Sequence, residues 1–101
     1  MKLTIAVQLE MKKEEDGGRH EPFTEGYCPH LVISGTTEWL GVRASKCLAP
    51  VAPGQTAEVE FELMYHPELD YKGLKTGVNF SMVEGPKVVG NGRVVKGIEI
   101  K

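Results

Sequence analysis

The chain has 101 residues, a net charge of −2 at pH 7, and hydrophobic and charged fractions of 41% and 26%. A chain of this length buries roughly two thirds of its unfolded surface, so we expect a single domain over residues 1–101. The ordinary composition excludes a disordered tail, and the slightly negative charge excludes attraction of nucleic acid by the whole molecule.

The N-terminal residues alternate polar and apolar side chains up to Glu10, unlike a secretory signal. No apolar run approaches the roughly 20 residues of a membrane-spanning helix. We therefore expect a soluble, cytoplasmic protein with no membrane partner. Its two cysteines, Cys28 and Cys47, are too few for a disulfide framework and are expected to remain thiols.

The first predicted strand carries apolar side chains at every second position from Leu3 to Met11. HLVISGTT (residues 30–37) and EWLGVRASKCL (38–48) follow, both rich in β-branched or aromatic residues. TAEVEFELMYH (56–66) alternates most clearly. The residues expected to face the core are Ala57, Val59, Phe61, Leu63 and Tyr65, and those expected to face water are Thr56, Glu58, Glu60 and Glu62.

Two more strands are predicted over residues 77–85 and 87–100, and turn residues such as Gly17-Gly18 and Gly85-Pro86 separate the strands. Residues 67–76 have room for a helical turn, but Gly73 opposes a longer helix. The glycines of GNG (90–92) predict a bulge or a close-packed bend. Six strands predict an all-β fold, and we favour a closed barrel because closure leaves few unpaired edges.

Three blocks of the sequence resemble the third, C-terminal domain of the translation elongation factor Tu family. GGRHEPFTEGYCPHL (17–31) resembles the family pattern GGRH-T-PF followed by GYRPQ. VAPGQTAEVEFEL (51–63) resembles MPGD and its strand, and GVNFSMVEGPKVVGNGRVV (77–95) resembles GLRFAIREGGRTVGAGVV. The resemblance covers about residues 8–96 in order. It implies a six-stranded antiparallel closed barrel of the elongation factor Tu C-terminal domain type, as a stand-alone small protein.

In that family the GTPase activity belongs to a separate domain. This chain has no phosphate-binding loop of that kind, so we expect no enzyme activity, no GTP binding and no cofactor. The family's barrel contacts the T stem of aminoacyl-tRNA, the nucleotide exchange factor and its own GTPase domain. The resemblance therefore implies a non-enzymatic interaction module with a role in translation or its regulation.

The resemblance places His30 at the family's tRNA-contacting glutamine and Glu84 at its glutamate. Cys28 and Val83 stand where the family has arginines, and Lys87 stands for a later arginine. Because each lost cation weakens phosphate binding, we expect a protein partner. A tRNA- or RNA-binding accessory role is the alternative, with His30 donating to a phosphate or sugar oxygen.

Arg19 and His20 keep the GGRH pattern and are candidates either for a binding rim or for hydrogen bonds that tie the long loop to the barrel. We expect Phe23 to plug the barrel end and Tyr27 to be a half-buried ring with a hydrated hydroxyl. Trp39, the single tryptophan, is a candidate interface anchor if exposed, with inward packing as the alternative. The candidate contact residues are Arg19, His20, His30, Trp39, Glu84 and Lys87.

A metal- or thiol-dependent enzyme is a more distant alternative. Cys28 and His30 are two residues apart and would suit a thiol–imidazole pair or half of a zinc site. One such pair is less than a structural zinc site requires, so we expect no metal site and a free, partly buried Cys28. The acidic row from Glu58 to Glu62 is either a solvated face or a patch that meets a basic partner.

Overall fold

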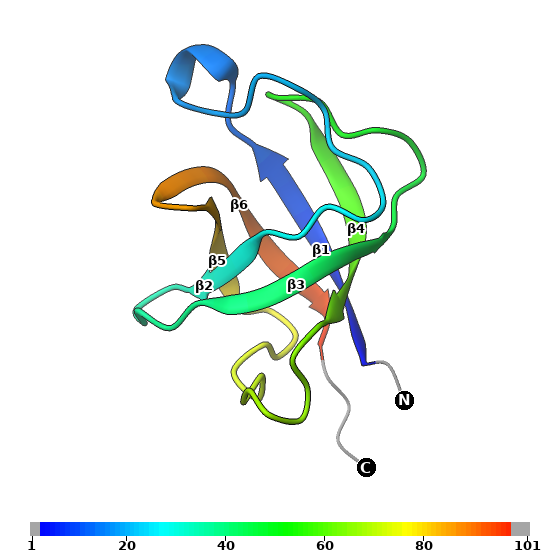
Figure 1. Ribbon diagram of the computed structural model, residues 1–101, viewed down its shortest axis with the longest axis vertical. Helices are drawn as coiled ribbons and strands as arrows, with labels where there is room; N and C mark the ends of the chain where they lie inside the picture. Colours follow the sequence, from blue (N-terminus) through cyan, green and yellow to red (C-terminus); the bar gives the residue numbers. More distant parts are fainter. Residues whose placement is uncertain (1–2, 98–101) are drawn as a thin grey trace.

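The computed structural model describes residues 3–97. These residues form β1 (Thr4–Met11), the short 3-10 helix η1 (Glu14–Asp16), β2 (His30–Ile33), β3 (Leu40–Lys46), β4 (Thr56–Leu63), β5 (Asn79–Glu84) and β6 (Lys87–Lys96). All paired strands are antiparallel, and the barrel closes in the order β1-β4-β3-β2-β5-β6 (Figure 1). The predicted all-β class and the six-stranded antiparallel closed barrel are confirmed. Among residues 3–97, no helix has the length and apolarity to span a bilayer.

The core is built from the inward-facing side chains of the strands, as the period-two pattern predicts, together with Tyr71 and Leu74 from the connection between β4 and β5. Its largest fully buried members are Tyr71, Phe61, Phe80, Ile5, Leu9, Leu31, Leu74 and Met82. The prediction that Tyr65 faces this core is wrong. Strand β4 ends at Leu63 and the chain then turns, so Tyr65 lies outside with 51% of its surface exposed.

The glycines of β6 allow close packing, as the GNG motif predicts. A Cβ atom at Gly92 would lie 2.5 Å from Cζ of Phe80 and 2.7 Å from the Gln8 carbonyl oxygen. The irregularity in β6 lies slightly earlier, where Met82 pairs with Gly90 but Val83 pairs with Val88. The barrel wall therefore bends through a bulge followed by bare backbone.

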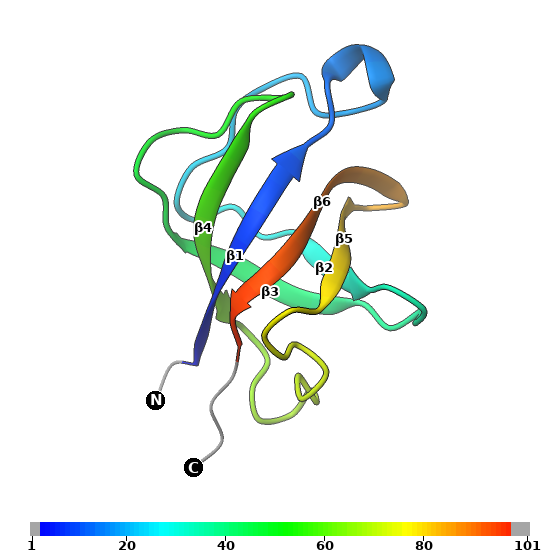
Figure 2. The same ribbon diagram turned by 180° about the vertical axis from the view of Figure 1, so that it is seen from behind.

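Two long connections cover opposite ends of the barrel (Figures 1 and 2). Residues 12–29 join β1 to β2, and backbone hydrogen bonds of 3.0 and 2.8 Å join Phe23 to Val51 in the connection between β3 and β4. Phe23 is buried in the core, as expected. Residues 64–78 form several turns and no helix. In one turn the Leu69 N–H donates to the Tyr65 carbonyl, as in a single turn of α-helix.

Candidate partner-binding surface

A cluster of three side chains fixes the connection between β1 and β2 to the end of β5. The Arg19 guanidinium forms an ion pair with Glu84, and the Tyr27 hydroxyl donates to the same Glu84 oxygen at 2.6 Å. Arg19 also lies 4.4 Å from the centre of the Tyr27 ring and donates to the Glu21 carbonyl. We call Arg19, Tyr27 and Glu84 the Glu84 cluster. Of the two hypotheses for Arg19, the structure therefore shows the internal tie.

The cluster's electrostatics stabilise a charged carboxylate beside a neutral phenol. Partial burial raises the pKa of Glu84, but hydrogen bonds from Tyr27 and Arg19 outweigh this effect, so the pKa falls below its ordinary value. Burial and then the hydrogen bond to Glu84 raise the pKa of Tyr27 strongly. The Tyr27 ring is half-buried, as expected, and its hydroxyl has a carboxylate partner.

The remaining predicted charged residues lie at the edge of this cluster or apart from it. Lys87 is exposed and pairs in register with Glu84 across the β5–β6 turn, where its charge also lowers the Glu84 pKa. His20 is apart, since its Nδ1 lies 2.8 Å from Glu14 Oε1 on the exposed connection. Arg19, Glu84 and Lys87 therefore lie together, and His20 has a different partner.

His30 and Trp39 meet on the outside of β2 and β3. The register places His30 opposite Gly41 and Leu31 opposite Leu40. Because Leu31 and Leu40 point into the core, the alternation turns His30 and Trp39 outward. Their ring centroids are 5.5 Å apart, and 45% of the Trp39 surface is exposed.

Tyr65 extends this outer surface. Any Cβ atom at Gly41 would collide with the Tyr65 ring, so the ring packs on the bare backbone beside His30. We call His30, Trp39 and Tyr65 the aromatic face. Tyr65 was predicted to face the core because the alternation of apolar and polar residues continues past Leu63, where β4 ends.

A buried tyrosine supports the aromatic face from the core side. The Tyr71 hydroxyl donates to the Gly41 carbonyl at 2.6 Å and accepts from the Tyr65 N–H at 3.0 Å. Tyr71 is almost fully buried, and burial raises the pKa of its hydroxyl. Tyr71 thus ties the strand that carries Gly41 to the residue that covers it. Its irregular sequence context, with no alternation, gave no indication of this role.

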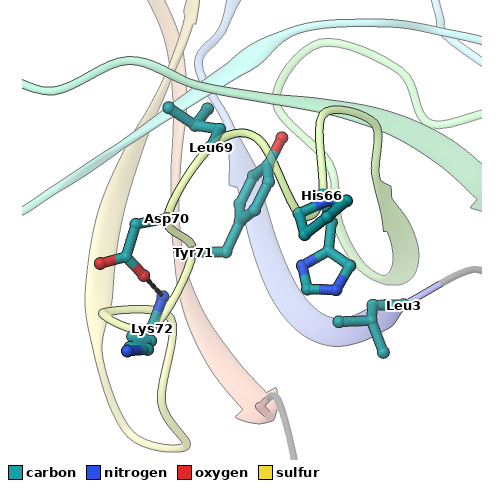
Figure 3. Close-up of a pocket in the computed structure, with 7 residues that line it drawn as sticks. Leu3, His66, Leu69, Asp70, Tyr71 and Lys72 are labelled. Carbon is teal, nitrogen blue, oxygen red and sulfur yellow. Dashed lines mark hydrogen bonds between the residues drawn. The ribbon is translucent and has the colours of Figure 1, made fainter.

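Beside Tyr71 lies a hollow of about 430 Å³ whose lining includes Leu3, His66, Asp70 and Lys72. Figure 3 shows Leu3 and His66 on one side and Asp70 and Lys72 on the other. The Asp70 carboxylate accepts the backbone N–H of Lys72 at 2.9 Å. Among the described residues, no side chain of this lining is hydrogen-bonded to another, so the hollow shows no nucleophile–base pair.

The surroundings of Cys28 bear on the hypotheses of a metal site and of a reactive thiol. Cys28 is exposed, so the expectation of a partly buried thiol is wrong, and its Sγ lies 3.2 Å from the Gly26 carbonyl oxygen. The chain reaches β2 only at His30, which leaves Cys28 in the preceding loop. Within residues 3–97, no three His, Cys, Asp or Glu side chains are grouped as metal ligands.

A search with models of known protein families finds no match to this chain.

Proposed function

We propose that this protein is a non-enzymatic interaction module, a barrel of the elongation factor Tu C-terminal domain type, that binds a protein partner through the aromatic face. The observation that carries this proposal is the exposure of Trp39 beside His30 and Tyr65. Tryptophan and tyrosine, together with arginine, are enriched among the residues that dominate binding energy at protein interfaces.

The position of Arg19 supports a protein partner over RNA. Phosphate binding needs cations that are free to replace counterions. Arg19 is instead held by Glu84 and Tyr27, and Glu84 adds a carboxylate close to Lys87. The alternative, a tRNA-binding accessory protein, would depend mainly on His30 and Lys87 at this end of the barrel.

The family type is supported by the order of the three residue blocks and is compatible with the closed six-stranded barrel. In such a barrel the module would act by docking, and a role in translation or its regulation follows from the resemblance alone. The partner, by this argument, presents an apolar or aromatic patch that covers Trp39.

The test compares Trp39→Ala with Val95→Ala, a matched control because Val95 is also an exposed apolar residue, at 47%, on the distant strand β6. Partners are captured from nuclease-treated cell extract, purified, and titrated against each variant. We expect Trp39→Ala to weaken the purified complex by about tenfold or more and Val95→Ala to leave it unchanged.

The same preparations are applied to immobilised tRNA across a salt series. Retention that falls steeply with salt, is lost on Lys87→Ala and is insensitive to Trp39→Ala would contradict the proposal and favour the RNA-binding alternative. A purified protein partner whose affinity is indifferent to Trp39→Ala would also contradict it.

A further inference from the structure

At the far end of β3 from Trp39, a leucine stands almost entirely in solvent. Leu48 is 95% exposed, in contrast to the buried Val51 that follows it in the same connection. It borders two hollows of about 330 and 200 Å³, which also share Glu58. We call this pair of hollows, with Leu48 between them, the Leu48 groove.

The two halves of the groove differ in chemistry. The larger hollow lies over Ala6 and is bordered by Glu58, Glu60 and Lys46. Ala6 pairs with Glu60 across β1 and β4, and its small side chain leaves the outer surface low at this point. The smaller hollow is lined mainly by apolar side chains, namely Ala49, Pro50, Val51 and Ala57, with Gln55 at its edge.

Hydrogen bonds hold one wall of the apolar half in place. The Gln55 side chain accepts the Ala52 N–H at 2.8 Å, and Val51 is joined by backbone hydrogen bonds to Phe23. A preformed wall of this kind lowers the entropy cost of binding. These bonds fix the side of the groove that runs from Val51 to Gln55.

The charges of the larger hollow select a basic occupant. It presents two carboxylates against one ammonium. Among residues 3–97, Glu58 has no ion-pair partner, and Glu60 accepts a hydrogen bond from the Ser45 hydroxyl at 3.0 Å. Glu58 and Glu60 are two residues apart on one strand, which places them about 7 Å apart.

An extended peptide repeats its side chains at the same interval of about 7 Å. Cations at alternate positions of such a segment would face Glu58 and Glu60, and the next side chain on the same face, if apolar, would reach Leu48. Strand β4 is already paired with both β1 and β3, so its backbone is not open to strand addition. Recognition must come from side chains.

We propose that the Leu48 groove binds an extended basic–apolar peptide segment of a partner protein, with its cations over Glu58 and Glu60 and an apolar side chain against Leu48. This site is separate from the aromatic face, because the length of β3, roughly 20 Å, lies between them (Figure 1). It goes beyond the proposed function and does not depend on Trp39.

The test uses a blocked seven-residue peptide with arginine at its first and third positions and leucine at its fifth, so that all three side chains share one face. It is titrated into isotopically labelled protein and followed by NMR. We expect shifts centred on Leu48, Ala57 and Glu58. A peptide with glutamate in place of arginine is the charge control. Leu48→Ala and the double variant Glu58→Gln/Glu60→Gln should each weaken binding by about fivefold or more.

Two further variants make the prediction directional. Lys46→Gln removes the one cation of the larger hollow and should strengthen binding of the arginine peptide by about twofold. Trp39→Ala should leave the affinity for the arginine peptide unchanged. The proposal for the aromatic face and the proposal for this groove can therefore be refuted separately. Because Leu48 is exposed, Leu48→Ala should unfold at the same temperature as the unmodified protein.

Several results would overturn the proposal. These are equal binding of the glutamate peptide, shifts centred on Trp39 and His30, or an affinity that Leu48→Ala does not alter. Concentration-dependent shifts at the groove without peptide would show that a second copy of this chain occupies it, which also overturns the assignment.

Discussion

Replacing Tyr71 by phenylalanine removes one oxygen atom that serves two hydrogen bonds. That hydroxyl donates to the Gly41 carbonyl at 2.6 Å and accepts the Tyr65 N–H at 3.0 Å. The ring itself stays in the core, so the change leaves packing almost intact and isolates the polar contribution. Each such bond contributes about 0.5–1.5 kcal/mol net, and the expected loss in unfolding free energy is about 1–3 kcal/mol.

The assay is urea unfolding followed by the fluorescence of Trp39, the single tryptophan. For a domain of this size, the loss corresponds to a fall in Tm of about 4–8 °C for each kcal/mol. Tyr65→Phe is the matched control. It removes a hydroxyl from a half-exposed ring and should change the free energy of unfolding by less than about 0.5 kcal/mol.

Amide hydrogen exchange supplies a second measurement. The Tyr65 N–H loses its acceptor in Tyr71→Phe and should exchange faster, whereas buried amides of β1 and β4 should follow only the global change in stability. An unfolding free energy within about 0.5 kcal/mol of the unmodified protein, together with unchanged exchange at Tyr65, would refute this account of how the aromatic face is supported.

Three further predictions concern other parts of the barrel. Partial burial raises the Glu84 pKa, but hydrogen bonds lower it by more, so they stabilise the fold above the pKa of the unfolded state, and this stabilisation is lost as pH falls through the pKa of the folded state. Glu84→Gln should flatten this acid dependence in urea titrations, and an unaltered pH profile would contradict the prediction. Gly92→Ala, whose new Cβ would lie 2.5 Å from the Phe80 ring, should cost about 1–3 kcal/mol, and unchanged urea unfolding would disprove the close packing. Cys28 is exposed, whereas burial and then the charge of Glu25 raise the pKa of Cys47; a thiol reagent should therefore modify Cys28 first, and equal rates in the two single-cysteine variants would count against this.

Strand positions and core residues could be predicted from the sequence because they depend on the local alternation of polar and apolar residues. In the first strand, every second side chain from Ile5 to Met11 is buried, since a pleated strand sends neighbouring side chains to opposite faces. Turn residues located the breaks for a similar reason, because glycine accepts the positive φ angle of 58° at Gly85. These preferences act over a few residues and need no knowledge of the rest of the chain.

The candidate surfaces were less accessible. From the sequence, Arg19 could either line a binding site or hold the long connection to the barrel. Only its contact with Glu84, 65 residues away in sequence, decided between these two roles. Tyr65 was assigned to the wrong face because its position depends on where the strand ends and on the missing side chain of Gly41. Leu48 carried no distinguishing pattern, and its exposure depends on how the connection leaves β3.

The sequence by itself determined an all-β chain with its strands, turns and most of its core, because hydrophobic periodicity and backbone preferences operate between near neighbours. Only the tertiary structure decided which side chains meet across the closed barrel, that Trp39 and Leu48 stay in solvent, and that Arg19 is bound internally. The physical reason is that exposure and partnership depend on strand register and loop path, which bring together residues that are distant in sequence.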